Sequence, residues 1–241
     1  MQLKSSLLLC LSLATHLIPT AQACGGLSQR SEDGAYNPMV FGKDCAPKPF
    51  AAGYKFNHLA LIVNNLTASI DFYTKGIGMT VLFTFKPLEK LPIYIVYMGH
   101  NEGLKNSTTP FGSCEEFALK KNSVSGLVEL VYYGDSTYRP IPTTALSNTF
   151  SHLGLVVPDV KATQDRLEAM NARILKRVGE WDSNNVDEGL NNIYGLGRLA
   201  AHFTKAEQKE IWDAFRPAGG ERFLFVEDPD GNVLEVEPPD A

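Results

Sequence analysis

Two stretches of this chain repeat each other, and each contains a histidine that is followed further on by a glutamate. Residues 57–73 and 151–167 are identical at six of seventeen aligned positions, and His58 aligns with His152. Later in the chain, Gly-Leu-Val-Glu129-Leu-Val resembles Asn-Val-Leu-Glu235-Val-Glu. A duplicated strand–helix–strands unit therefore supplies two His and two Glu in matching places. Two imidazoles and two carboxylates are a suitable ligand set for a divalent metal ion.

Residues 1–23 have the pattern of a secretory signal peptide. Lys4 precedes an apolar stretch at 7–13, and Ala21-Gln22-Ala23 forms a small-residue cleavage site. The apolar stretch is too short to cross a bilayer, and no later segment approaches the roughly 20 apolar residues that a membrane span needs. We therefore expect a secreted, extracellular protein without a membrane span, whose mature chain starts at Cys24.

Charge and compartment limit the partners and modifications of the chain. It carries 22 Lys and Arg against 27 Asp and Glu, and this acidic balance argues against a nucleic-acid partner. Secretion permits N-glycosylation at the acceptor triplets that begin at Asn65 and Asn106. Secretion also favours disulfides, and the candidate cysteines are Cys24, Cys45 and Cys114. Their number is odd, so one thiol stays free or pairs between chains, and the sequence does not choose the pairing.

Hydrophobic periodicity and turn residues divide the rest of the chain. Residues 24–53 are predicted to form an irregular arm, and residues 54–239 a domain of two modules, 55–135 and 150–238, with an insertion at 182–220. Strands are expected near 55–63, 80–86, 92–98, 126–133, 150–156, 173–178, 222–227 and 232–237. Helices are expected at 66–77, after an N-cap at Asp159, and from a capping box at Thr204 to Phe215. Residues 100–121 are predicted to be a long loop, and Asp228-Pro-Asp-Gly231 a turn without a catalytic role.

The motifs that follow these histidines and glutamates resemble those of a known family. They are His58 with Ser69-Ile-Asp-Phe-Tyr73 and Gly78-Met79, Val128-Glu129-Leu130, His152 with Leu155-Val-Val-Pro-Asp159, and Phe225-Val-Glu-Asp-Pro-Asp-Gly231 leading to Glu235. Two βαβββ units with these motifs resemble the vicinal oxygen chelate superfamily, and within it glyoxalase I (lactoylglutathione lyase). The resemblance extends over residues 55–238.

This resemblance implies a fold, a metal site and a reaction. The fold would be α+β, with two βαβββ modules forming a curled mixed sheet around one divalent Ni, Co, Zn or Mn ion. The ligands would be His58, Glu129, His152 and Glu235, held either between the subunits of a homodimer or within one chain. The substrate would be a small carbonyl compound, typically a 2-oxoaldehyde captured as a thiohemiacetal and isomerised through a metal-bound enediolate. Glu235 would act as the leading base, with Glu129 as its partner.

The chain departs from glyoxalase I at positions that hold glutathione in that family. Ile62, Tyr133 and Asn148 replace the polar residues expected there. Ile62 and Tyr133 should lie on the same strand faces as the metal ligands, and they predict a more apolar substrate pocket. Arg198, Arg216 and Arg222 are other candidate cations. The use of glutathione as co-substrate is therefore left open.

Two other functions are compatible with the same fold. The altered positions favour a secreted protein that binds or sequesters a ligand without glyoxalase activity, with or without a metal. A ring-cleaving dioxygenase would use only two His and one carboxylate, leaving open positions for oxygen. The fourth ligand, Glu129, favours the isomerising enzymes over the dioxygenases.

Overall fold

The computed structural model describes residues 46–104, 109–134, 142, 150–184, 203–216 and 219–239. The chain divides into two units, Met1–Tyr54 and Lys55–Ala241. In the first unit, Pro49–Ala51 forms a 3-10 turn, η1. The signal peptide, Cys24, Cys45, Asn106, Asn148 and Arg198 lie outside the described residues, so the predictions for them stay predictions. None of the helices in the described ranges is long and apolar enough to cross a membrane.

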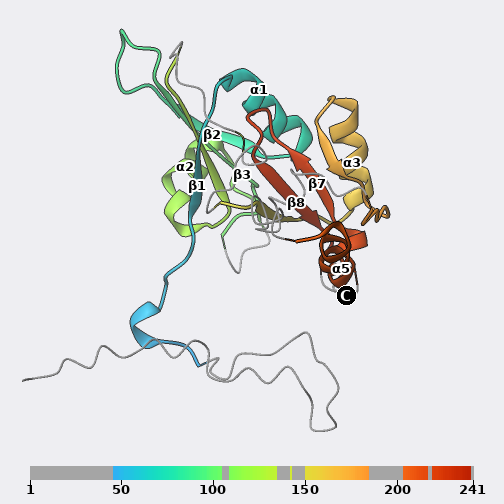
Figure 1. Ribbon diagram of the computed structural model, residues 1–241. Helices are drawn as coiled ribbons and strands as arrows, with labels where there is room; N and C mark the ends of the chain where they lie inside the picture. The colour runs from blue at the N-terminus through green and yellow to red at the C-terminus, as the bar shows by residue number, and fades with distance from the viewer. Residues whose placement is uncertain are drawn as a thin grey trace, which may run out of the picture. The chain divides into compact units, whose positions relative to one another are not determined.

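The second unit contains two four-stranded mixed sheets of the same topology (Figure 1). The strands of the first sheet are β1 (His58–Ile62), β2 (Thr80–Phe85), β3 (Tyr94–Gly99) and β4 (Leu127–Tyr132), in the order β1-β4-β3-β2. Those of the second are β5 (Leu153–Val156), β6 (Ile174–Lys176), β7 (Leu224–Glu227) and β8 (Val233–Glu237), in the order β5-β8-β7-β6. In each sheet the first strand pairs in parallel with the last, and the other pairs are antiparallel. The predicted α+β fold of two βαβββ modules is confirmed, although the described strands form two sheets and not one.

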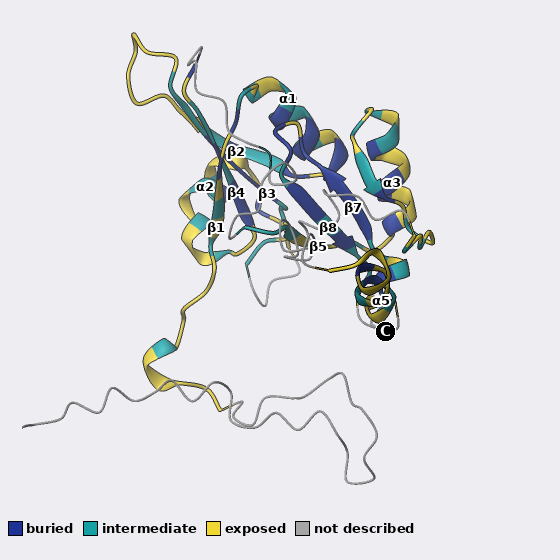
Figure 2. Cartoon of the chain, viewed as in Figure 1, coloured by how far each residue is buried: buried dark blue, intermediate teal, exposed yellow. Residues whose placement is uncertain are grey.

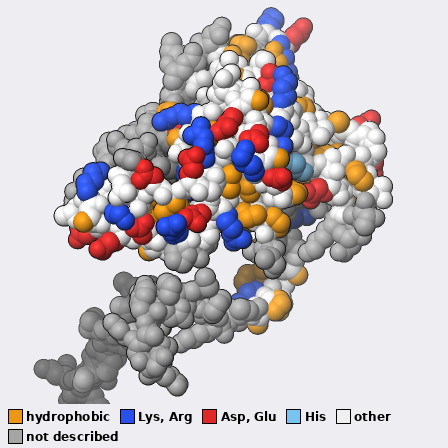
Figure 3. All heavy atoms as spheres, turned by 90° about the vertical axis from the view of Figure 1, so that its right-hand side faces the viewer, with side chains coloured by type: hydrophobic (Ala, Val, Ile, Leu, Met, Phe, Trp, Pro, Cys, Tyr) orange, Lys and Arg blue, Asp and Glu red, His pale blue; other side chains and the backbone are white. Residues whose placement is uncertain are grey.

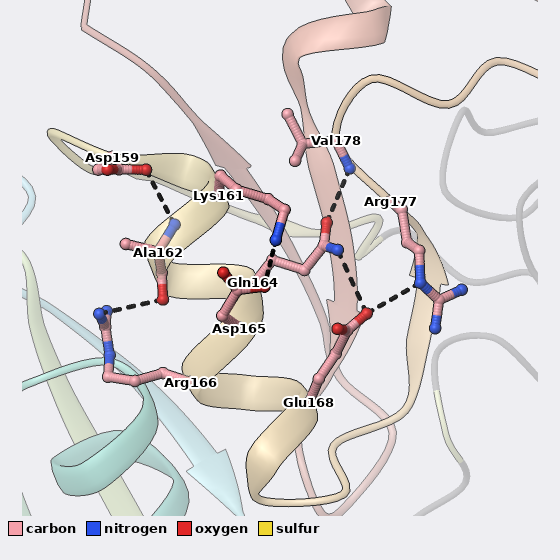
Figure 4. Close-up of polar contacts among 9 residues, drawn as sticks. All are labelled: Asp159, Lys161, Ala162, Gln164, Asp165, Arg166, Glu168, Arg177 and Val178. Carbon is pink, nitrogen blue, oxygen red and sulfur yellow. Dashed lines mark hydrogen bonds and ion pairs between the residues drawn. The ribbon is translucent and has the colours of Figure 1, made fainter.

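Each module has one helix after its first strand, and a side chain caps each helix. Helix α1 (Leu66–Asp71) starts where Asn65 accepts a hydrogen bond from the Ala68 N–H, and it continues as a π-helical turn, η2 (Phe72–Gly76). Helix α3 (Val160–Ala169) starts at the predicted N-cap Asp159. Figure 4 shows this cap, together with the Gln164 side chain that accepts a hydrogen bond from the Val178 N–H. The hydrogen bond from Gln164 ties α3 to the segment that follows β6.

The prediction of a long loop at 100–121 is wrong in part, because this segment contains a helix. Helix α2 (Cys114–Leu119) is followed by a 3-10 turn, η3 (Lys121–Ser123). Ser113 caps α2 by accepting a hydrogen bond from the Glu116 N–H. Phe117 anchors the helix in a small cluster with Phe111, Leu82, Tyr97 and Leu127. The Ser-x-x-Glu pattern was a local signal for this helix start.

The insertion after β6 contributes the predicted capped helix. Helix α5 (Lys205–Phe215) begins at Thr204, and both hydrogen bonds of the capping box are present. Its Trp212 is buried and packs against Trp181, with ring centroids 5.3 Å apart. A final 3-10 turn, η5 (Gly220–Arg222), leads into β7.

One hydrophobic core is shared by both modules. Val128 and Leu130 of β4 and Leu234 and Val236 of β8 belong to the same buried cluster. Figure 2 shows β7 and β8 as buried, while the outer surfaces of α3 and α5 are exposed. Side chains alternate between the two faces of a strand. The residues between these apolar positions, Glu129 and Glu235, therefore point away from the shared core.

The turn between β7 and β8 joins the two modules through buried aspartates. Asp230 accepts hydrogen bonds from the backbone N–H and the side-chain amide of Asn64, both at 2.8 Å, and from the Ser69 hydroxyl at 3.2 Å. Asp228 accepts a hydrogen bond of 3.0 Å from the buried Tyr73 hydroxyl. Burial raises the pKa of Asp228 above its ordinary value, and burial together with Asp228 raises that of Tyr73. The aspartates of the predicted turn thus act as a link between modules.

The surface around α3 carries charges of both signs. Figure 3 shows Lys and Arg interspersed with Asp and Glu on this face, without a large patch of one sign. Several of these charges form pairs four residues apart along a helix, such as Lys161 with Asp165. This face offers no basic stripe of the kind that nucleic-acid binding requires.

Asp230→Ala should lower the free energy of unfolding by about 2–4 kcal/mol, because it removes the buried carboxylate that accepts hydrogen bonds from Asn64 and Ser69. Asp165→Ala is the control: it removes an exposed ion pair on α3 and should leave the free energy of unfolding nearly unchanged. Urea denaturation of both variants measures the difference. Equal midpoints would show that the turn does not hold the modules together.

Candidate metal centre

His58 and Glu129 form a close pair on the first sheet. β1 and β4 are parallel neighbours, and the register places Ala60 opposite Glu129. His58 lies two residues before Ala60 and therefore on the same sheet face as Glu129. The His58 Nε2 atom lies 3.0 Å from Glu129 Oε2, and the side chains are 36% and 16% exposed. The predicted ligands of the first module are brought together at a site that solvent and a ligand can reach.

Asn57 orients the His58 ring. The Asn57 side-chain amide nitrogen donates hydrogen bonds to the carbonyls of Lys121 and Val124, at 2.8 and 2.9 Å. The Asn57 oxygen therefore faces His58 Nδ1, at 3.0 Å. An amide oxygen only accepts hydrogen bonds, so Nδ1 carries a proton and donates a hydrogen bond to Asn57. In the neutral ring the lone pair is then on Nε2, the atom that faces Glu129 and that a metal ion would take.

Tyr97 of β3 adds a third group to this pair. The register places Tyr97 opposite Glu129, and its hydroxyl lies 2.8 Å from Glu129 Oε2. Burial and this hydrogen bond raise the pKa of Tyr97 to about 12. The phenol therefore keeps its proton at neutral pH and donates a hydrogen bond to the carboxylate. Nothing in the local sequence of β3 signals this contact, because it depends on the register between strands.

The second module repeats the pair. His152 Nε2 lies 3.0 Å from Glu235 Oε2, and the side chains are 26% and 16% exposed. The Ser151 hydroxyl lies 2.9 Å from His152 Nδ1, in the place that Asn57 takes in the first module. Phe225 lies opposite Glu235 in the register, where the first module has Tyr97. The two halves therefore share one geometry but differ in the groups that support it.

The four predicted ligands do not meet in one cluster. Among the described residues, which include all four, no group of three or more His, Cys, Asp or Glu side chains is placed to hold a metal ion. Each pair supplies two donors of the right chemistry, while a protein site for Zn or a similar ion needs three or four. The residues therefore fit a metal ion only where a His58–Glu129 pair and a His152–Glu235 pair face each other across one site.

The sheet faces that carry these pairs also expose apolar side chains. Ile62 of β1 and Tyr133 after β4 are 46% and 52% exposed, and Val156 of β5 is 57% exposed. By strand alternation each lies on the face of its module's His–Glu pair. Ile62 and Tyr133 thus share the predicted ligand face, and their contact with a substrate stays a prediction.

An apolar cavity of about 470 Å³ opens beside the first pair. Its lining includes His58 and Leu59 of β1, Leu127 and Val128 of β4, and Leu153 and Leu155 of β5. Of the four candidate ligands, His58 alone belongs to this lining. The cavity therefore gives the first pair an apolar neighbourhood contributed by both modules.

The remaining predicted residues take ordinary surface positions. Arg216 pairs with Glu221, and Arg222 is exposed. Cys114 is exposed and has no disulfide partner among the described residues, and its candidate partners lie outside them, so the disulfide stays a prediction. Asn65 is exposed while its side-chain oxygen caps α1. Its glycosylation stays a prediction.

Sequence reasoning missed a buried cation on the second sheet. Lys176 of β6 lies opposite Phe225 and therefore on the face of Glu235. Its ammonium donates hydrogen bonds to the carbonyls of Arg177 and Phe223, at 3.0 and 2.7 Å. Burial lowers the pKa of Lys176 to about 8. The pattern of a short strand gave no sign that this lysine is buried.

The motifs and geometry agree with comparisons to known proteins. The sequence model of the Glyoxalase/Bleomycin resistance protein/Dioxygenase superfamily matches residues 55–185. The chain belongs to this superfamily, as the sequence motifs predicted. A lactoylglutathione lyase of Pseudomonas putida is 27% identical over 143 residues, which are 57% of this chain and 79% of that protein.

Solved structures of the superfamily resemble the chain at low identity. The trypanothione-dependent glyoxalase I of Leishmania major is 20% identical, with a TM-score of 0.42 and coverage of 77% of this chain and 86% of that one. Glyoxalase I of Zea mays is 17% identical, with a TM-score of 0.44 and coverage of 76% and 43%. The family assignment itself rests on the sequence match.

Proposed function

We propose that this protein is a secreted glyoxalase I-like metalloenzyme. It would isomerise a 2-oxoaldehyde thiohemiacetal or a related small carbonyl compound. The observation that carries the proposal is the pair of equivalent His–Glu contacts, each 3.0 Å long, in the two modules of a glyoxalase-superfamily chain. The signal-peptide pattern at residues 1–23 supports secretion.

The complete site would form between two copies of the chain. One chain offers two separate pairs on sheet faces turned away from its core. Exposed apolar side chains lie on the sheet face of each pair, and burying such side chains favours association. In a two-fold homodimer, the first-module face of one protomer would meet the second-module face of its partner, and each dimer would contain two sites.

The chain's own residues would move a proton within the substrate. His58 and His152 would fix a divalent ion through Nε2, with Glu129 and Glu235 completing the set. Such an ion, when bound, supplies Lewis-acid polarisation of the substrate oxygens. Glu235 would take the proton from the carbon that bears the sulfur and return it to the adjacent carbon, so that the thiohemiacetal becomes a thioester without net oxidation or reduction. The apolar cavity beside His58 would offer an apolar surface to the substrate.

Two nitrogen and two oxygen donors suit Ni, Co, Zn or Mn. Glutathione is one candidate thiol for the substrate adduct. Ile62 and Tyr133 give the ligand face an apolar border, which favours a less polar adduct.

A second candidate function is ligand binding without catalysis. The exposed apolar side chains on the ligand faces favour it, since they suit an apolar ligand as well as a protein partner. The two functions differ in one respect that can be measured. A binding protein retains ligand without converting it, whereas the enzyme turns over substrate and loses this activity with its metal.

Glu235→Gln should reduce turnover by about 10²–10⁴-fold, because the amide cannot accept the substrate proton. The assay follows thioester formation from methylglyoxal and glutathione by metal-reconstituted, secreted protein, with and without a chelator. Glu237→Gln, two residues along β8, is the matched control and should retain activity. Wild-type turnover that survives in Glu235→Gln or in the chelator would contradict the mechanism. Stoichiometric metal without turnover would favour the binding function.

Mixing two inactive variants tests whether the site is shared. Glu129→Gln and Glu235→Gln homodimers each lack both sites. After denaturation and refolding together, half of the dimers are mixed and hold one intact site of two, so about a quarter of wild-type activity and metal content should return. Each variant refolded alone is the control. No recovery would place the complete site within a single chain.

A further inference from the structure

The neighbour of the glutamate differs between the two His–Glu pairs by one hydroxyl group. Tyr97 lies opposite Glu129 in the first sheet, and Phe225 lies opposite Glu235 in the second. These are equivalent positions, each on the third strand of its module and beside the strand that carries the glutamate. The His–Glu distance is the same in both modules, 3.0 Å. The difference between phenol and phenyl therefore gives the two glutamates different neighbours at one equivalent position.

The Tyr97 hydroxyl restrains the Glu129 carboxylate. It donates a hydrogen bond of 2.8 Å to Oε2, the same oxygen that lies 3.0 Å from His58 Nε2. Rotation of the carboxylate would break a hydrogen bond to a charged acceptor, the stronger kind of hydrogen bond in proteins. Phe225 offers no donor to Glu235, because a phenyl ring carries no hydroxyl.

Tyr97 is itself held in place from several sides. Phe83 stacks on its ring with centroids 5.0 Å apart, and the His58 ring meets it edge-on at 5.3 Å. The Lys121 ammonium lies over the ring, 4.8 Å from its centroid. The carbonyl of this same Lys121 accepts a hydrogen bond from Asn57, which orients His58. The η3 turn therefore contacts the supports of both first-module ligands.

We propose that Tyr97 is a positioning residue that holds Glu129 as a fixed metal ligand, whereas Phe225 leaves Glu235 free to move a proton. This inference rests on the proposed metalloenzyme function and deepens it. A carboxylate that transfers a proton between neighbouring carbons must change its hydrogen bonds during the reaction, and a fixed ligand must not. One hydroxyl thus gives the glutamates at two equivalent positions different roles, Glu129 as a fixed ligand and Glu235 as a base.

The test exchanges the hydroxyl between the modules. Tyr97→Phe should weaken Co²⁺ or Ni²⁺ binding by about 10-fold, the lower end of the effect of removing a group that supports a metal ligand, and should alter the visible absorption of the Co²⁺ form. Phe225→Tyr should retain metal affinity and lower kcat by at least about 10-fold, because Glu235 becomes restrained. Tyr94→Phe, which removes a hydroxyl from the same strand but from its opposite face, is the matched control and should change neither quantity.

The outcomes separate this inference from the function on which it rests. Wild-type protein that binds none of Co²⁺, Ni²⁺, Zn²⁺ and Mn²⁺ would overturn the proposed function, and with it the role of Tyr97. Wild-type protein that binds metal while Tyr97→Phe binds it equally well, with an unchanged Co²⁺ spectrum, would overturn the positioning role alone. Urea denaturation of each variant distinguishes a lost ligand restraint from a lost fold. Phe225→Tyr with full kcat would show that Glu235 needs no freedom to act.

Discussion

The burial of one apolar core between two repeated sheets determines where the chemistry of this chain can lie. Glu129 is flanked in sequence by Val128 and Leu130. Glu235 is flanked by Leu234 and Val236. All four apolar residues belong to one buried cluster. Strand alternation then places each glutamate on the opposite face, beside a histidine at the start of the neighbouring parallel strand or just before it. The buried aspartates of the β7–β8 turn hold the modules in this arrangement.

The same constraint explains why a single chain carries two half-sites. Each half-site has one imidazole, one carboxylate and an apolar border, and neither has enough donors to hold a divalent ion by itself. Their supports are unequal, since Asn57 and Tyr97 restrain the first pair while Ser151 and Phe225 flank the second.

Much of this fold could be predicted from local sequence, because its signals are local. The repeat located His58 and His152, alternation located the ligand faces, and Asp159 and Thr204 marked two helix starts that the structure confirms. The roles of Tyr97, Lys176 and Asp230 could not be predicted, because each depends on contacts across strands or between modules. Helix α2 was missed although its Ser113 cap was visible, because polar residues with Gly and Pro surround it. The sequence predicted four ligands and left open whether they meet within one chain or between two, because that depends on how the modules pack.

Native mass spectrometry of the metal-loaded protein tests the central claim most directly, because it reports assembly and metal content on the same molecules. The account predicts a dimer that carries two metal ions, and monomers, released by dilution, that carry none. A monomer that retains one ion would show that the two His–Glu pairs close within a single chain. A dimer that binds no ion would show that the paired histidines and glutamates serve a purpose other than metal binding.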